Sequence, residues 1–210
     1  MLLHEKLKPY RLLLASQSPR RRELMTGCGI PYELAPRYDC EERYPAGLAA
    51  EQVPLYLSGL KSDAYPAPLA EDEILLTADT VVILRGEVLG KPADRDEALR
   101  MLGRLSGSSH TVVTGVTLRT AARRHAFAAR SDVRFRTLTD EEIAYYVDTF
   151  RPYDKAGAYG IQEWIGYAAI EGIEGSFYNV MGLPIQRLYV ELERFLADIE
   201  HPSDNETTNT

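Results

Sequence analysis

Residues 73–84 read EILLTADTVVIL, an almost unbroken run of aliphatic and β-branched residues. A run of this length and composition predicts a long, buried strand. No glycine or proline lies near Asp79 in its middle, so a role for this acid in a turn or helix cap is disfavoured. An ionised carboxylate between apolar neighbours is costly unless a cation or hydrogen-bond donors compensate it. The run therefore predicts a buried strand that carries a functional acid.

The flanking sequence predicts further strands in irregular alternation with amphipathic helices. One helix begins at Asp94 with Glu97 three residues on and ends at Gly107, and another begins at Thr139 with Glu142, because this spacing is typical of a capping box. The other expected strands span 11–15, 32–36, 110–120, 126–136 and pieces of 167–180, and the other expected helices span 184–199 and, less regularly, 54–65. Without a strict βαβ rhythm, this order favours an α/β fold with a mixed sheet.

Composition limits the class of protein. The chain has 210 residues, 45% hydrophobic content and a formal net charge of −7. We expect one compact unit over residues 1–200 and a disordered polar tail over 201–210. A negative field repels polyanions, so nucleic acid is not an expected partner and any anion site is a local exception. No apolar run approaches the roughly 20 residues that span a bilayer, and the first residues lack a secretion signal, so we expect no membrane partner and a cytoplasmic location.

Three consecutive arginines follow a turn signal where a helix is expected to begin. Ser18 and Pro19 fit the N-cap and first helical position, which places residues 20–22 in the first turn. The positive end of the helix dipole disfavours each cation there by roughly 0.3–1 kcal/mol. Two interpretations stay open: a solvated basic turn, or a phosphate site formed by free backbone N–H groups, the hydroxyls of Ser16 and Ser18, and the guanidinium groups.

An acidic loop is expected at residues 38–45, which read YDCEERYP. Asp39, Glu41 and Glu42 lie there among few apolar residues. Such carboxylates suit Mg²⁺, which proteins usually hold with one or two carboxylates while substrate phosphates complete the coordination. A merely solvated loop is the alternative.

Two further polar residues follow special backbone positions. Lys91 precedes Pro92, which restricts its conformation, and it could reach the same cleft as Asp79, although alone it is typical of a surface lysine. Gln162 closes the glycine-containing segment YDKAGAYGIQ, where it could read a base edge by paired hydrogen bonds. His110 begins a strand, where a histidine is more often structural than catalytic.

Taken together, ordered segments of the chain resemble the Maf family of nucleoside triphosphate pyrophosphatases. They are LASQSPRRREL, TADTVVILRGEVLGKP, ALRMLGRLSGSSHTVVTGV, DVRFRTLTDEEIAYYV, YDKAGAYGIQ and GSFYNVMGLPIQRL, and they run from about residue 11 to 195. The resemblance implies two α/β lobes around an elongated mixed sheet, with helices flanking the sheet and a central cleft, similar to the inosine triphosphatase group. It also implies hydrolysis of a nucleoside triphosphate to the monophosphate and pyrophosphate with Mg²⁺ or Mn²⁺.

The resemblance also assigns roles by position. It implies that the catalytic residue is Asp79, that the substrate-binding residues are Ser16, Arg20, Arg21, Lys61, Lys91 and Gln162, and that the metal ligands are Glu42 and Asp79. The family loop is often Asp-x-Asp-Glu, whereas this chain has Asp39-Cys40-Glu41-Glu42, so the identity of the metal-binding acid stays open.

The segment DKAGAYGIQ resembles the branch of the family that acts on dTTP and UTP. The expected protein is therefore a dTTP and UTP pyrophosphatase, and the resemblance suggests a homodimer. One alternative is a diphosphatase for purine or modified nucleotides. The other is a nucleotide-binding regulator of cell division without turnover, which would have little use for Asp79 or Glu42.

Overall fold

A computed structural model describes residues 1–201 of the chain, so all but the first residue of the expected tail lies outside the described part. The strands are β1 (Arg11–Leu14), β2 (Glu33–Leu34), β3 (Glu73–Leu84), β4 (Glu87–Leu89), β5 (Ser109–Arg119), β6 (Arg124–Phe135) and β7 (Ile170–Glu174). The helices are α1 (Leu3–Lys6), α2 (Pro19–Gly27), α3 (Val53–Asp63), α4 (Arg95–Leu105), α5 (Asp140–Phe150), α6 (Trp164–Ala168), α7 (Phe177–Met181) and α8 (Ile185–Glu200), with 3₁₀ turns at Ala50–Gln52 and Ala156–Ala158.

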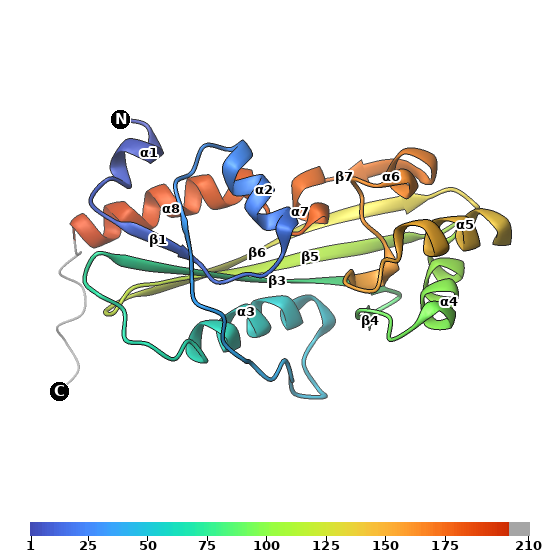
Figure 1. Cartoon of the computed structure of the whole chain (residues 1–210), viewed down its shortest axis with the longest axis horizontal. Coiled ribbons are helices and arrows are strands. Elements are labelled where there is room, and N and C mark those ends of the chain that lie inside the picture. Colours follow the sequence, from blue (N-terminus) through green and yellow to red (C-terminus); the bar gives the residue numbers. More distant parts are fainter. Residues whose placement is uncertain (202–210) are drawn as a thin grey trace.

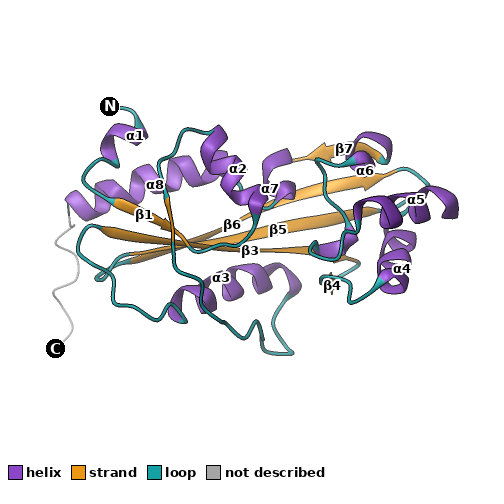
Figure 2. Cartoon of the chain, viewed as in Figure 1, coloured by secondary structure: helices purple, strands orange, loops and turns teal. Residues whose placement is uncertain are grey.

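The strands form one mixed sheet of seven strands in the order β2-β1-β3-β5-β6-β7, with β4 paired to β3 (Figure 2). β1 runs parallel to β2 and β3, and the other neighbours are antiparallel. Helices α1, α2, α7 and α8 lie on one side of this elongated sheet and α3 on the other, while α4, α5 and α6 lie at the end away from the N-terminus (Figure 1). The expected α/β fold, with its long mixed sheet and flanking helices, is confirmed.

The central strand β3 spans the run 73–84 that was expected to form it, and its alternation supplies both faces of the sheet. Val81 and Ile83 pack with Val53 and Leu57 of α3, which covers one face. The even-numbered apolar residues of β3 join the large core on the other face, where α2, α7 and α8 lie (Figure 1). This parity places Asp79 on the α3 face and its neighbour Thr80 on the opposite face.

Helix α3 forms even though Gly59 interrupts its apolar pattern. A Cβ at Gly59 would come within 2.5 Å of the Arg124 Nη2 atom, so a guanidinium lies across the helix at this position. Arg124 also donates to Asp63 at the end of α3 (2.8 Å). The glycine that weakens the helix signal in the sequence therefore serves a tertiary contact.

The prediction of strand pieces over 167–180 is wrong for the C-terminal part of that range. Only Ile170–Glu174 is extended, and the chain then forms the short helix α7. Gly175 adopts φ +115°, and the Ser176 hydroxyl caps the helix by accepting from the Asn179 N–H (3.4 Å).

The strand expected over 32–36 shortens to the two-residue edge strand β2, and α1 and α6 were not expected. Among residues 1–201, no helix combines the length and apolar character needed to cross a bilayer.

Candidate active site

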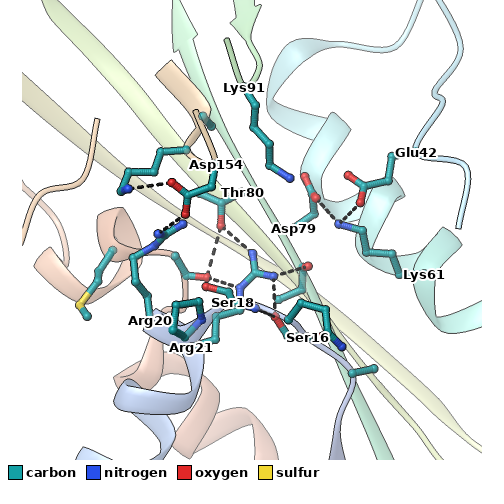
Figure 3. A pocket seen from close by; sticks show the side chains of 18 of the residues that line it. Ser16, Ser18, Arg20, Arg21, Glu42, Lys61, Asp79, Thr80, Lys91 and Asp154 are labelled. Carbon is teal, nitrogen blue, oxygen red and sulfur yellow. Dashed lines mark hydrogen bonds and ion pairs between the residues drawn. The ribbon is translucent and has the colours of Figure 1, made fainter. Parts of the chain in front are cut away.

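A cavity of about 490 Å³ opens over the middle of β3 (Figure 3). Its wall comes from the β1–α2 turn, the acidic loop, α3, β3, the segment 154–162 and the turn at residue 182. All the site residues that the sequence indicated line it: Ser16, Arg20, Arg21, Glu42, Lys61, Asp79, Lys91 and Gln162. Segments far apart in the sequence thus converge on one space.

The start of α2 presents a nearly uncapped helix end to the cavity. Ser18 is the N-cap residue, as expected, and its side chain makes no capping hydrogen bond within the described residues. The Ser16 hydroxyl accepts from the Ser18 N–H (3.2 Å). Arg20 donates to Asp154 (2.8 Å), while Arg22 turns away to the backbone carbonyl of residue 17 and does not line the cavity. Two of the three arginines therefore face the cavity, which favours the anion-site interpretation.

Arg21 is half-buried and ties α2 to the sheet. Its Nε donates to the Gly182 carbonyl (2.8 Å), and its Nη1 donates to the Ala78 carbonyl (2.9 Å) and to Ser16 Oγ (3.4 Å). Its Nη2 donates to Thr80 Oγ1 (3.2 Å). Burial lowers the pKa of this guanidinium. With most of its N–H groups engaged, Arg21 holds the cavity floor rigidly and has limited donor capacity left for a ligand.

An acid–lysine cluster occupies the opposite wall (Figure 3). Lys61 Nζ lies 2.5 Å from Asp79 Oδ1 and 3.1 Å from Glu42 Oε1. Asp79 is only 7% exposed, and this burial raises the pKa of its carboxyl while the Lys61 ammonium opposes the rise. Lys91 points toward the same cluster. The parity of β3 and the position of Lys61 in the last turn of α3 together explain why the two side chains meet.

The acidic residues fit a divalent cation whose coordination a substrate completes. No group of three or more potential ligands occurs within residues 1–201, but Asp79 and Glu42 converge on one ammonium and could both reach one cation. Mg²⁺ commonly takes one or two carboxylates together with substrate phosphates. Of the other two acids, Asp39 lines the cavity, whereas Glu41 turns outward to Arg43 (2.8 Å).

A further part of the cavity wall is formed by residues 154–162, which meet the start of α2 where Arg20 pairs with Asp154. Gln162 places its Oε1 atom in a buried position with no hydrogen-bond partner in the described part of the chain. A buried acceptor left unpaired costs about 1–3 kcal/mol, so a ligand donor is expected there. Gly157 adopts φ +67°, and a Cβ there would approach Val82 Cγ2 to 2.9 Å, which explains the glycine next to the strand.

Several lining residues were not singled out from the sequence. Thr80 is an ordinary strand residue until the fold places it under Arg21. Tyr38 donates to the Lys61 carbonyl (2.7 Å) and so fastens the acidic loop to α3, with no signal in the sequence. Asp154 and Lys155 gave a usable signal, because two opposite charges directly precede a glycine-containing segment.

Comparison with known proteins agrees with this architecture. The model of the Maf-like protein family matches residues 11–195. A dTTP/UTP pyrophosphatase from Porphyromonas gingivalis W83 is 55% identical, covering 91% of this chain and 97% of that protein. A protein of the same name from Bacteroides thetaiotaomicron is 54% identical, covering 90% and 97%.

A solved nucleoside-triphosphatase, a dITP/XTP pyrophosphatase from Mycobacterium abscessus, aligns with 90% of this chain and 98% of its own at 16% identity. Its TM-score is 0.39, which is too low to bear on the fold. The family match covers nearly the whole described chain, and the relatives share more than half of their residues with it. The chain therefore belongs to the Maf family.

Proposed function

We propose that this protein hydrolyses dTTP and UTP to the nucleoside monophosphate and pyrophosphate. The observation that carries the proposal is the buried Asp79 carboxylate, bonded to Lys61 in a cavity that Arg20 and Lys91 also line. An acid surrounded by cations suits the attack of water on a phosphorus atom of a nucleotide, because the cations attract the phosphates and the acid can take a proton. The names of relatives that are 54–55% identical over about 90% of this chain support the choice of substrate.

In the proposed reaction, water attacks the α-phosphorus and pyrophosphate leaves. Asp79 either orients the water and accepts its proton or holds the cation that activates the water. Arg20, Lys61 and Lys91 neutralise the charge that spreads over the phosphate oxygens, which is the main source of stabilisation in such reactions. Glu42 and Asp79 would hold a divalent cation, Mg²⁺ or Mn²⁺, which supplies further neutralisation at those oxygens.

The backbone of the β1–α2 turn and the start of α2 would receive the phosphate chain. Helix N–H groups and the Ser16 hydroxyl donate there, so the charged tail lies at one end of the cavity. The base would lie beside Gln162, which also lines the cavity and whose amide offers an acceptor beside donors. This arrangement suits a base that presents an N–H next to a carbonyl, as uracil and thymine do.

We also propose, from the family resemblance, that the protein is a homodimer in the cytoplasm and that residues 1–200 form a single domain. Light scattering on the purified full chain measures the mass in solution. A monomeric mass at micromolar concentration would contradict the dimer.

Asp79→Asn tests the central role. We expect it to fold, to bind nucleotide and to lose at least a hundredfold in turnover, since positioned general bases contribute 10²–10⁴-fold. The measurement is release of pyrophosphate and orthophosphate from dTTP, UTP, CTP, ATP and GTP, with and without Mg²⁺. Asp148→Asn is the matched control, because Asp148 is an exposed acid that pairs with Arg95 outside the cavity.

Three outcomes would contradict the proposal. Parental turnover in Asp79→Asn would remove the acid from the reaction. Orthophosphate in place of pyrophosphate would mean cleavage at another bond. Preference for a purine nucleotide, or tight binding of nucleotides without turnover, would point to one of the alternative functions.

A further inference from the structure

Three polar side chains converge on Gly160 in the wall of the cavity. A Cβ at Gly160 would lie 3.0 Å from Lys155 Cε, 3.1 Å from Gln162 Nε2 and 3.1 Å from Glu163 Cδ. Lys155 and Gln162 line the cavity, whereas Glu163 is not part of the wall formed by residues 1–201. The absence of a side chain at residue 160 therefore lets an ammonium and an amide lie next to each other at the cavity wall.

A buried network holds the Lys155 ammonium in place. Lys155 is 8% exposed, and its Nζ lies 2.7 Å from Asp154 Oδ1 and 3.1 Å from Glu163 Oε1. The Tyr146 hydroxyl donates to the other carboxylate oxygen of Glu163 and accepts from the Gly160 N–H (3.0 Å). An ammonium carries three N–H groups, and two of them face carboxylates. One donor is left for a ligand.

The carboxylates already balance the charge of this ammonium, so it has no excess positive charge to attract phosphate. Asp154 and Glu163 both lie within 3.1 Å of it, and Arg20 pairs with the other oxygen of Asp154 (2.8 Å), so the four groups together carry no net charge. Asp154 stays ionised, since the hydrogen bonds from Lys155 and Arg20 outweigh its burial and lower its pKa to about 2. A neutral acceptor such as a carbonyl oxygen therefore fits the remaining Lys155 donor better than a phosphate oxygen does.

Lys155 and Gln162 together match the hydrogen-bonding edge of a pyrimidine-dione ring. Uracil and thymine present an N3–H flanked by two carbonyl oxygens. The unpaired Gln162 Oε1 can accept the N3–H while Lys155 donates to the carbonyl oxygen at C4. Cytosine has an amino donor at C4 and no hydrogen on N3. The Lys155 ammonium would therefore face another donor, and the Gln162 Oε1 atom would face another acceptor.

We propose that Lys155 is a specificity-determining residue, which donates to the C4 carbonyl oxygen of the uracil or thymine base beside Gln162, with Glu163 and Tyr146 as positioning residues behind it. The inference rests on the proposed function, since it requires a nucleoside triphosphate with its base in this part of the cavity. It adds the group that rejects cytosine.

The test compares UTP with CTP, which differ only at positions 3 and 4 of the base. The main variant is the double substitution Lys155→Met with Glu163→Gln, which leaves the net charge unchanged and no buried carboxylate without its partner. We expect kcat/KM for UTP to fall at least tenfold and that for CTP to change less than threefold, because a site built to bond a polar group discriminates strongly. Lys6→Met, which removes a surface pair with Glu193 (3.0 Å), is the control and should leave both values unchanged.

Inorganic tripolyphosphate separates base reading from phosphate binding. Its inhibition constant should change less than threefold in the double variant, since it has no base. A rise as large as the change for UTP would mean that Lys155 serves the phosphates, and would overturn the inference. An unchanged UTP-to-CTP preference in the folded double variant would overturn it as well.

Two further arms keep the test decisive. If the double variant does not unfold cooperatively on heating, Lys155→Arg replaces it. This variant keeps the charge but moves the donors, and it should also lose preference for UTP. If the parent releases no pyrophosphate from UTP, the proposed function fails. The inference is then judged on equilibrium binding of UTP and CTP to Asp79→Asn with and without the double substitution, where an equal loss for both nucleotides would refute it.

Discussion

Asp79 and Thr80 are adjacent in the sequence and serve opposite faces of β3. Asp79 meets Lys61 of α3, whereas Thr80 Oγ1 receives a hydrogen bond from Arg21 on the other face. The acid could be singled out from the sequence because a carboxylate in an apolar run needs a partner. Thr80 could not, since threonine is common in strands. Residues that contradict their local surroundings are thus the ones a sequence reveals.

His110 illustrates a residue whose burial has a measurable consequence. It is 3% exposed, its Nε2 lies 2.7 Å from the Tyr159 hydroxyl, and its ring packs against Phe135. Burial lowers the pKa of His110 to about 4, with the nearby Asp132 opposing the shift. The imidazole is therefore neutral in the folded protein at neutral pH, in keeping with the structural role expected for it.

The resulting prediction concerns stability in mild acid. The unfolded chain binds a proton at His110 below about pH 6.5, whereas the folded chain does so only near pH 4, so stability falls as the pH drops through this window. Between pH 7.5 and pH 5 the loss due to His110 is about 2 kcal/mol. In His110→Gln, urea unfolding at the two pH values should show a difference smaller by about this amount. A difference equal to that of the parent would contradict the prediction.

At the scale of the element, the contact between α3 and β5 places Lys61 at the site. The start of α3 packs against β5 at Gly115, where a Cβ would lie 2.3 Å from atoms of Pro54 and Leu55. These atoms belong to the helix backbone, which cannot move aside as a side chain can. Gly115 is paired with Asp79 in the sheet register, so the helix is set directly above the acid.

Gly115→Ala is therefore expected to push α3 off the sheet. We expect a loss of about 1–3 kcal/mol in the free energy of unfolding, as overpacking typically causes, and a lower kcat because Lys61 moves away from Asp79. Gly103→Ala in α4 is the control. Gly103 is exposed with no atom within 4 Å of an added Cβ, and alanine there should stabilise the helix by about 0.5–1 kcal/mol. Urea midpoints and turnover of both variants check the pair. Parental stability in Gly115→Ala would refute the close packing.

The helices also show how far local patterns carry. Thr139 and Glu142 form the complete capping box that their spacing predicts. Asp94 caps α4 by accepting from the Glu97 N–H (2.8 Å), but the Glu97 carboxylate accepts from the Ala93 N–H (2.7 Å) and not from Asp94, so the reciprocal half of the box is wrong. The Ser176 hydroxyl caps α7 within a segment rich in residues that favour strands. The segment nevertheless forms a helix, as the cap favours.

At the scale of the whole molecule, the cavity reverses the sign of the surrounding charge. The chain carries a formal net charge of −7, yet within residues 1–201 six basic and four acidic side chains line the cavity. Attraction of a triphosphate is therefore local and is screened within about 10 Å at ordinary salt. The cavity also joins segments from residue 15 to residue 182, so a ligand in it bridges most of the fold.

Ligand binding should accordingly stabilise the whole protein. A UTP analogue with nitrogen between the α- and β-phosphorus, at a hundredfold over its Kd, should raise Tm by roughly 5–10 °C. Differential scanning fluorimetry with and without the analogue measures the shift. Uridine, which lacks the phosphates, should give a much smaller one at the same concentration. An equal shift for both compounds would mean that the phosphates contribute little to binding.

The sequence alone was enough to indicate the mixed α/β class, the central strand and the buried acid Asp79, because burial patterns, capping pairs and a misplaced charge are local properties. Lys61 and the roles of the other predicted site residues came from the resemblance to the family. The distance between Asp79 and Lys61, the outward turn of Glu41 and Arg22, and the convergence of Lys155, Gln162 and Glu163 on Gly160 became visible only with the packing of the elements. These features depend on contacts between residues far apart along the chain, and no local pattern encodes how such segments approach one another.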